Sequence, residues 1–286
     1  MINSIGLIVD ENPISRSYIN ILKKNNLKLK YLVYLFKPNF FFKILSARLN
    51  FLKKNSFAIN FLKDNEILKL TNQIENHFNF EKDFCKKMYN FDNIFDISEK
   101  IYFINDQNIN SLKSINFFSE VPKTIFINTG NQILKKILDT EHQFVHIHPA
   151  YLPQTKGADG SLWQIKKYGN LGISTFYMNK GIDTGKIIFR EKLDIPKLKL
   201  KNLKKYSTKD LYRIWFSFFD PLLRGYQFQK LVNENFNFEK FTIKTDIEEK
   251  DEYHTFMDKN DQKDEYHTFM DKNDQKDIFN EIFDDN

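Results

Sequence analysis

The sequence predicts an α/β protein built on an open, mostly parallel sheet. Short apolar segments of strand length alternate with segments of helical spacing, and 286 residues, 41% of them hydrophobic, are enough for a sizeable core. The first unit has an apolar strand at residues 5–9, a turn, a helix over 15–24 and a second strand at 31–35. This β-α-β order is typical of the start of a Rossmann-like sheet.

The next elements follow the same alternation. Residues 36–70 are apolar with interspersed lysine and arginine, and we expect a helix packed on the sheet with its lysines outward. The alternative for this segment is a basic amphipathic helix that lies on a membrane surface. Further strands are expected at 101–104 and 124–127, and the second of these ends in a turn that opens a helix over 133–138. No Gly-x-Gly-x-x-Gly follows the first strand, so the dinucleotide-binding fingerprint is absent.

Composition indicates a reducing, aqueous compartment. Cys85 is the only cysteine, which excludes a disulfide scaffold and a multi-cysteine zinc site. No apolar run approaches the roughly 20 residues of a membrane span, and residues 1–10 lack the basic flank and long apolar stretch of a secretory signal. We therefore expect a cytoplasmic protein.

The net charge of +6 is unevenly distributed along the chain. Residues 246–286 hold fifteen acidic residues and five lysines, a net charge of −10, so residues 1–245 carry +16. A basic body is typical of proteins that bind a phosphorylated substrate, nucleic acid or an anionic membrane, and the acidic end argues against nucleic acid. Within that end, residues 251–263 recur identically as 264–276. A repeat of this length is too short, and two copies are too few, to stack into a core.

The segment that carries most chemistry is residues 144–188. A strand ends in His146 and His148, and a proline-bounded loop, a short helix starting near Asp159, another strand and a Gly-Ile-Asp-Thr-Gly turn around Asp183 follow. Residues two apart on a strand point to the same side, so the two histidines should share one face of the sheet. Ligands gather at the carboxyl ends of strands in open α/β sheets, where the Asp183 carboxylate can join them.

This segment resembles the signature of the formyltransferases that use 10-formyltetrahydrofolate. The family pattern is Asn-x-His-x-x-x-Leu-Pro-x-x-x-Gly, then a Gly-Val/Ile-Thr strand, then Asp-x-Gly. The resemblance covers residues 120–190 well and residues 1–120 only in strand order, and it implies the formyltransferase fold. The matching residues are His148, Leu152, Pro153, Gly157, Gly172, Ile173, Ser174, Gly181, Asp183, Thr184 and Gly185.

The resemblance implies direct transfer of a formyl group to an amine, with three catalytic residues. His148 would stabilise the tetrahedral oxyanion or move the amine proton. Asp183 would orient His148, raise its pKa and organise water. His146 departs from the pattern because the family has an asparagine there, whose amide donates to the formyl oxygen. An imidazole N–H could take the same role.

The resemblance also implies two loops that line the folate, and no metal. The first loop holds Thr129, Gly130 and Asn131, and the second holds Gly181 and Ile182. The loop after His148 adds candidate substrate contacts, although its polar side chains could simply be solvated. These contacts are Tyr151, Lys156 and Gly157.

Four branches of the family differ in their acceptor. The methionyl-tRNA branch carries a basic β-barrel after the catalytic domain, whereas here an apolar helix over 211–224 and an acidic end follow, which would repel tRNA. The glycinamide ribonucleotide branch has a glycine-rich phosphate loop after the first strand, which this chain lacks, and the formyltetrahydrofolate hydrolases have an additional N-terminal domain. We therefore expect an amino sugar linked to a nucleoside diphosphate as the acceptor, for cell-surface polysaccharide.

The resulting expectation is a one-carbon transferase with three regions. Residues 1–200 would form the catalytic domain, 201–245 a helical extension and 246–286 an acidic tail. Expected partners are the folate and the nucleotide-linked sugar, with no nucleic acid; membrane proximity is a further option, and the apolar segment 215–223 is a candidate homodimer surface. The alternatives are a non-catalytic relative, a relative of different specificity, or a metal-dependent enzyme that uses the His-x-His pair with Asp183.

Overall fold

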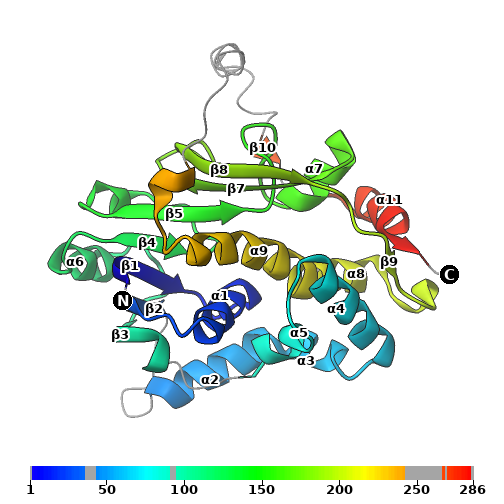
Figure 1. The fold of residues 1–286 in the computed structure, drawn as a ribbon, viewed down its shortest axis with the longest axis horizontal. Coiled ribbons are helices and arrows are strands. Elements are labelled where there is room, and N and C mark those ends of the chain that lie inside the picture. Colours follow the sequence, from blue (N-terminus) through cyan, green and yellow to red (C-terminus); the bar gives the residue numbers. More distant parts are fainter. Residues whose placement is uncertain (1, 36–42, 91–94, 242–265, 268, 285–286) are drawn as a thin grey trace.

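The computed structural model describes residues 2–35, 43–90, 95–241, 266–267 and 269–284. Its centre is a seven-stranded sheet of order β3-β2-β1-β4-β5-β7-β8 (Figure 1). The first five strands in this order are parallel, and β7 runs antiparallel to both of its neighbours. The predicted open, mostly parallel α/β sheet is therefore confirmed.

The strands agree closely with the apolar segments of the sequence. The strands of the main sheet are β1 (Ile2–Val9), β2 (Leu29–Leu35), β3 (Ser98–Ile104), β4 (Ile125–Asn128), β5 (Gln143–His148), β7 (Leu171–Tyr177) and β8 (Ile187–Leu193). Two short parallel pairs lie outside it, formed by β6 (Lys156–Gly157) with β10 (Tyr266–His267) and by β9 (Leu198–Lys199) with β11 (Phe283–Asp284).

Helices fill most of the connections between the strands. The α-helices are α1 (Pro13–Lys24), α2 (Lys43–Lys54), α3 (Ser56–Phe61), α4 (Asn65–His77), α5 (Phe84–Met88), α6 (Leu112–Glu120), α7 (Gly160–Tyr168), α8 (Thr208–Ile214), α9 (Asp220–Asn233) and α11 (Lys272–Ile282). Single turns of other helix types are η1 (Phe95–Ile97), η2 (Lys136–Asp139), η3 (Leu203–Lys205), η4 (Trp215–Phe219) and η5 (Phe238–Phe241).

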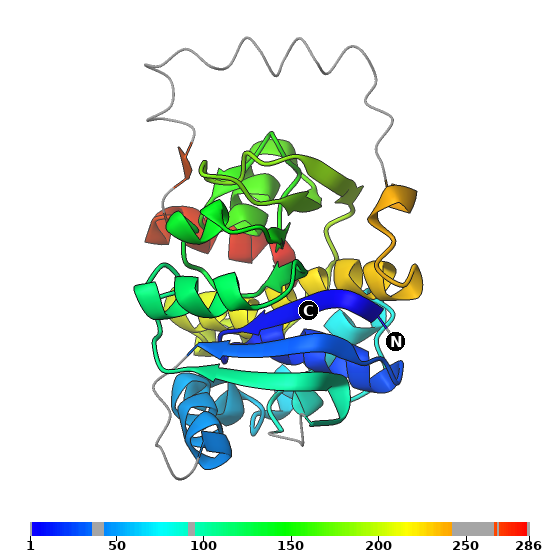
Figure 2. The same cartoon turned by 90° about the vertical axis from the view of Figure 1, so that its left-hand side faces the viewer.

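Helix α1 begins where its sequence provides a cap. The Asn12 side chain accepts a hydrogen bond from the Ser15 amide at 2.8 Å, and Pro13 occupies the first turn, where no amide donor is needed. One face of the helix is buried against α9, where Tyr18 stacks on Phe228 with ring centroids 4.1 Å apart. Figures 1 and 2 show these two helices side by side against one face of the sheet.

The predicted helix over 133–138 is wrong. The chain after β4 has no regular structure until the short turn η2. The reason is local, because the Asn110 side chain donates to the Ile133 carbonyl at 2.9 Å and accepts from the Lys135 amide at 2.6 Å. These bonds engage backbone groups that a helix would pair within itself.

The region predicted as a helical extension packs into the main core. Trp215, Phe218, Phe219, Leu222 and Leu223 are all fully buried. The expectation that segment 215–223 forms a homodimer surface is therefore wrong, since its apolar side chains pack on the sheet and on neighbouring helices instead.

The end of the chain also contacts the body, through the second copy of the repeat. The Met270 amide donates to the buried carboxylate of Asp159 at 2.8 Å, and Asp271 caps α11. Helix α11 then packs on α7 and α8, with Lys166 paired to Asp274. The first copy lies outside the described residues. In the part of the chain that the structure describes, no helix is long and apolar enough to cross a membrane.

Candidate active site

The two histidines of the sequence motif stand at the end of β5. This strand lies between the parallel β4 and the antiparallel β7, so the parallel part of the sheet ends here. His148 is the last residue of the strand and is buried, whereas His146 is half-buried. The carboxyl edge of the parallel strands is where open α/β sheets place ligands and catalytic groups, and the strand order reverses between β1 and β4, next to β5.

His148 faces the carboxylate of Asp183, as the motif predicts. Its Nδ1 lies 3.6 Å from Asp183 Oδ2, and its Nε2 lies 3.0 Å from the Thr155 carbonyl oxygen. A carbonyl oxygen only accepts, so Nε2 carries the proton and donates to it. The unprotonated Nδ1 therefore faces Asp183, and His148 can receive a proton at this nitrogen.

Asp183 is held in place by its own turn and by the loop after β5. Its Oδ2 accepts from the Gly157 amide at 2.8 Å, and its backbone has a left-handed conformation, with φ of 52°. Two residues on, a Cβ at Gly185 would lie 1.6 Å from the Tyr177 carbonyl oxygen, so only glycine fits there. The Gly-Ile-Asp-Thr-Gly sequence thus supplies the tight turn that carries the carboxylate to His148.

The charges of this pair follow from burial and from each other. Burial lowers the pKa of His148 and outweighs the opposing effect of the Asp183 carboxylate. Burial by itself raises the pKa of Asp183, but His148, the Gly157 amide and His146 outweigh it, and the net pKa is lowered. The expectation that Asp183 raises the pKa of His148 is correct for its own contribution, but burial reverses the net direction. At neutral pH the pair is a neutral imidazole beside a carboxylate.

His146 has a different environment from the one its position in the motif implies. Its Nδ1 lies 3.0 Å from the Asn128 carbonyl oxygen, and its Nε2 lies 3.2 Å from a guanidinium nitrogen of Arg224. Burial, followed by the positive charge of Arg224, lowers the pKa of His146 to about 4. The neutral ring therefore donates to Asn128 and accepts from Arg224, which leaves no N–H for an oxyanion in this arrangement.

Arg224 is a site residue that the sequence reasoning missed. This buried side chain on α9 donates to Asp220 Oδ2 at 2.8 Å and to the Ile147 carbonyl at 2.6 Å, besides its contact with His146. The other carboxylate oxygen, Asp220 Oδ1, is buried without a hydrogen-bond partner among the described residues. The available signal was an Asp and an Arg four residues apart in an otherwise apolar helical segment.

The first predicted folate loop directly follows β4. Thr129 is buried and donates through its hydroxyl to the Ile8 carbonyl at 2.7 Å, and the Gly130 amide donates to Asn128 Oδ1 at 3.1 Å. Asn131 is exposed. The loop is therefore fixed at its base, on the β4 side of His146, and open to solvent at its tip.

The second predicted folate loop is the turn that carries Asp183. Gly181 is exposed, and its amide donates to Asn179 Oδ1 at 3.0 Å. The Thr184 hydroxyl donates to the same oxygen at 2.8 Å, so one side chain closes the turn, and Ile182 is half-buried. Both predicted loops are thus ordered by bonds of their own.

The predicted substrate loop divides between two surroundings. Gly157 contacts Asp183 through its amide, as described, and Lys156 precedes it in the short strand β6. The Tyr151 ring lies instead under two cations of β8, with Arg190 and Lys192 each 4.6 Å from its centroid. Of these residues, only Gly157 directly contacts the His148–Asp183 pair.

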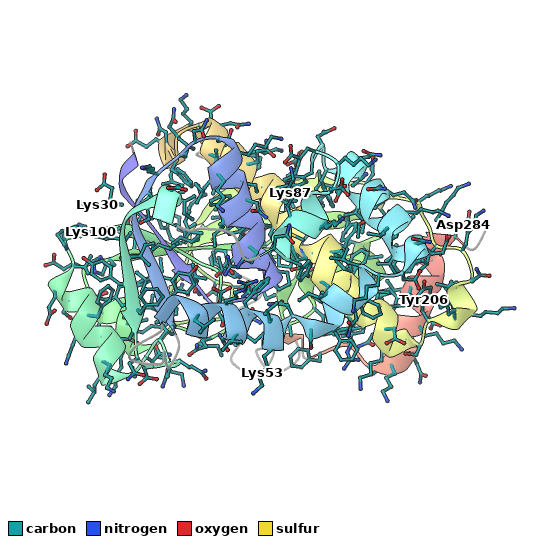
Figure 3. All side chains as sticks on the ribbon, turned by 90° about the horizontal axis from the view of Figure 1, so that it is seen from below. Lys30, Lys53, Lys87, Lys100, Tyr206 and Asp284 are labelled. Carbon is teal, nitrogen blue, oxygen red and sulfur yellow. The ribbon has the colours of Figure 1, made fainter. Side chains whose placement is uncertain are left out.

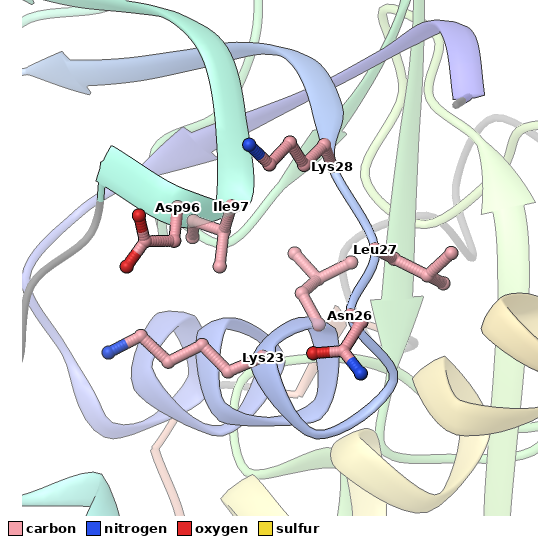
Figure 4. Close-up of a pocket in the computed structure, with 7 residues that line it drawn as sticks. Lys23, Asn26, Leu27, Lys28, Asp96 and Ile97 are labelled. Atoms are coloured by element: carbon pink, nitrogen blue, oxygen red, sulfur yellow. The ribbon is translucent and has the colours of Figure 1, made fainter.

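Two other features of the structure bear on alternative sites. No group of three metal-ligating side chains converges anywhere in the described residues, so the His-x-His alternative has no metal cluster to support it. A cavity of about 450 Å³ opens at the opposite edge of the sheet, where β2 and β3 begin (Figure 4). Its lining includes Lys23, Lys28 and Asp96, and none of the predicted site residues.

Known proteins similar to this chain are formyltransferases. No family model matches the sequence. A methionyl-tRNA formyltransferase of Alkaliphilus oremlandii (strain OhILAs) is 33% identical over 92 residues, which is 30% of this chain and 30% of that protein. The chain therefore matches less than a third of the length of this curated relative.

Solved structures with a similar course of the chain are formyltransferases as well. A sugar N-formyltransferase from Shewanella sp. FDAARGOS_354 has a TM-score of 0.44 and 14% identity, over 86% of this chain and 75% of that one. Phosphoribosylglycinamide formyltransferase from Streptococcus pneumoniae TIGR4 has a TM-score of 0.42 and 12% identity, over 82% and 96%. An N-formyltransferase from Helicobacter canadensis, in complex with folinic acid and dTDP-3-aminofucose, has a TM-score of 0.40 and 16% identity, over 82% and 64%. The sequence match to the methionyl-tRNA formyltransferase agrees with the resemblance that the sequence motif indicates.

Proposed function

We propose that this protein transfers a formyl group from 10-formyltetrahydrofolate to the amino group of a nucleoside-diphosphate-linked amino sugar. The observation that carries the proposal is the pairing of His148 with Asp183 at the carboxyl edge of the sheet, 3.6 Å apart. The ordered motif around them and the 33% identity to a methionyl-tRNA formyltransferase support the same reaction class.

The surroundings of this pair fit a folate donor. The loop after β4 and the turn around Asp183 are both braced by side chains, Asn128 in the first and Asn179 in the second. Each loop keeps an exposed residue, Asn131 and Gly181, beside that ordered backbone. We assign the folate to these two loops, where it would supply the formyl group as an electrophile.

The residues of the chain supply proton transfer at this place. His148 is neutral, and Nδ1 is the nitrogen that can take a proton, because Nε2 already donates to Thr155. A proton on Nδ1 would face the ionised Asp183, which stabilises an imidazolium. An attacking amine has a proton to lose, and a histidine with an adjacent carboxylate is suited to receive it.

The nature of the acceptor rests on charge and on elimination. Residues 1–245 carry +16, which suits a diphosphate, and residues 246–286 carry −10, which opposes tRNA. The curated relative acts on methionyl-tRNA according to its name, so that acceptor is the direct competitor in the experiment.

The test is mass spectrometry of reactions that contain 10-formyltetrahydrofolate and one acceptor each. The panel holds nucleotide-linked amino sugars, methionyl-tRNA and a reaction without acceptor. We expect the mass gain of one formyl group on an amino sugar. A gain on methionyl-tRNA alone would overturn the sugar assignment, and donor consumption without an acceptor would indicate a hydrolase.

A pair of histidine variants separates chemistry from folding. His148→Ala should lower turnover by about 10²–10⁴-fold, the usual contribution of a positioned acid or base. His77→Ala removes an exposed imidazole on α4 and serves as the matched control, with turnover unchanged. Full turnover in His148→Ala, with native circular dichroism, would refute the proposed role of the pair.

A further inference from the structure

We infer that α2 and α3 form a surface that binds an anionic lipid bilayer. This basic apolar surface consists of the exposed leucines and the phenylalanine of these two helices together with the cations between them, and it is independent of the proposed catalytic reaction. Its apolar members are Leu45, Leu49, Leu52 and Phe57, which are 50%, 58%, 38% and 47% exposed. Half of the eight large apolar side chains found exposed in the described residues thus fall within thirteen residues of the chain.

The leucines form one stripe on α2. At 100° per residue, Leu45, Leu49 and Leu52 lie within about 60° of one another around the helix axis. The body-facing side of the same helix carries Ala47 and Phe51, which are fully buried. The helix is therefore amphipathic toward the protein, yet it presents a second apolar stripe to solvent.

Cations flank this stripe on both sides. By the same geometry, Arg48 lies about 60° to one side of Leu45, and Lys53 lies about 80° to the other. Both are exposed, and Lys53 points outward from the molecule in Figure 3. Residues 43–63 contain five lysines and arginines and no acidic residue. An apolar stripe between cations is the pattern of helices that lie in the interface of an anionic membrane.

The surface is held rigidly on the body. Lys54 pairs with Asp10 at 2.5 Å, and the buried Asn55 side chain donates to the Glu11 carbonyl at 3.5 Å. On α3, Phe57 lies against the Arg213 guanidinium, whose central carbon is 3.4 Å from the ring centroid. The leucines are thus exposed while α2 is docked, so binding needs no rearrangement of the helix.

The charge of the surface distinguishes between three possible binding partners. A second copy of this chain would bring the exposed Arg48 and Lys53 against their own counterparts, and residues 43–63 hold no acidic residue to offset them, which opposes a symmetric dimer here. Nucleic acid would engage the cations but leave the leucine stripe in water. An anionic bilayer satisfies both, because its phosphates face the cations and its acyl region receives the leucines.

The experiment is co-sedimentation of the full-length protein with vesicles. One set is phosphatidylcholine, and the other is equal parts phosphatidylcholine and phosphatidylglycerol. We expect binding to the anionic set at about 0.1 M salt, and a strong decrease at about 1 M salt, where the screening length falls to about 3 Å. Equal binding to both sets, or none to the anionic set at low salt, would overturn the inference.

Two variants assign the binding to this surface. Leu45→Ser/Leu49→Ser should weaken binding by about tenfold or more, from the apolar area no longer buried in lipid. Lys53→Glu should weaken it by about fivefold or more, since one basic side chain near the surface contributes about that factor. Leu112→Ser is the control, because Leu112 is 75% exposed on α6, away from this surface.

The fold of the variants, their vesicle binding and the oligomeric state of the wild type complete the test of this surface. All these side chains are exposed, so circular dichroism should show a native fold in every variant. Unchanged vesicle binding in Leu45→Ser/Leu49→Ser would refute the surface. A dimer of the wild type in analytical ultracentrifugation that the same variant converts to a monomer would refute the lipid assignment in favour of a second copy of the chain.

Discussion

Replacing Arg224 by methionine should destabilise the protein more than any single change on the surface. The guanidinium donates to Asp220 and to the Ile147 carbonyl, and both acceptors are buried. Without it, the Asp220 carboxylate has no cation, and its Oδ1 already lacks a hydrogen-bond partner among the described residues. Removal of one member of a buried ion pair costs about 3–5 kcal/mol, and an unsatisfied carbonyl adds about 1 kcal/mol. We expect the free energy of unfolding to fall by about 5 kcal/mol.

The assay is urea unfolding at neutral pH, followed by the fluorescence of the two tryptophans, of which Trp215 is fully buried. A double variant, Arg224→Met/Asp220→Leu, removes both charges and should be more stable than Arg224→Met alone. Because Arg224 also lowers the pKa of His146, this pKa should rise in Arg224→Met, as measured by NMR titration. A loss below about 1 kcal/mol in Arg224→Met, or additive losses in the double variant, would refute the reasoning.

Three further predictions concern the histidines. The pKa of His146 is about 4 in the folded protein and 6.5 ordinarily, so the unfolded chain binds a proton first, and stability should fall as pH drops from 6.5 toward 4. Urea unfolding across this range checks it, and a decline equally steep in His146→Asn would contradict it. His146→Asn should raise turnover, by up to about 10²-fold, because an amide restores an N–H donor where the imidazole has none left; a loss in the same rate assay would show that the imidazole itself is needed. Gly160→Ala should lower turnover strongly and the melting temperature only slightly, because its Cβ would lie 2.9 Å from His148 Nε2. Turnover and melting temperature are measured together, and unchanged turnover would contradict the prediction.

The strands of the sheet were predictable because their signals are local. The apolar segments at 5–9, 31–35, 101–104 and 124–127 all lie within or overlap observed strands. The helix expected over 133–138 failed because the Asn110 side chain binds the backbone there, and the spacing of apolar residues does not report such competition.

The candidate site was predictable in part for a similar reason. The pairing of His148 with Asp183 follows from one continuous motif, in which glycines set the turn that carries the carboxylate. Arg224 lies 78 residues from His146 in the chain and reaches it only through the packing of α9 on the sheet. Burial, followed by the charge of Arg224, lowers the pKa of His146, and both effects depend on this long-range packing.

The contact between the second copy of the repeat and Asp159 gives the duplication a consequence for how this chain can change. Residues 251–263 and 264–276 are identical, so the sequence that donates to Asp159 and caps α11 is present twice. Loss of either copy leaves one complete segment, with a connection thirteen residues shorter, and the entropy of closing a long loop depends only weakly on its length. The chain could therefore lose one copy and still keep the sequence that contacts Asp159 and caps α11.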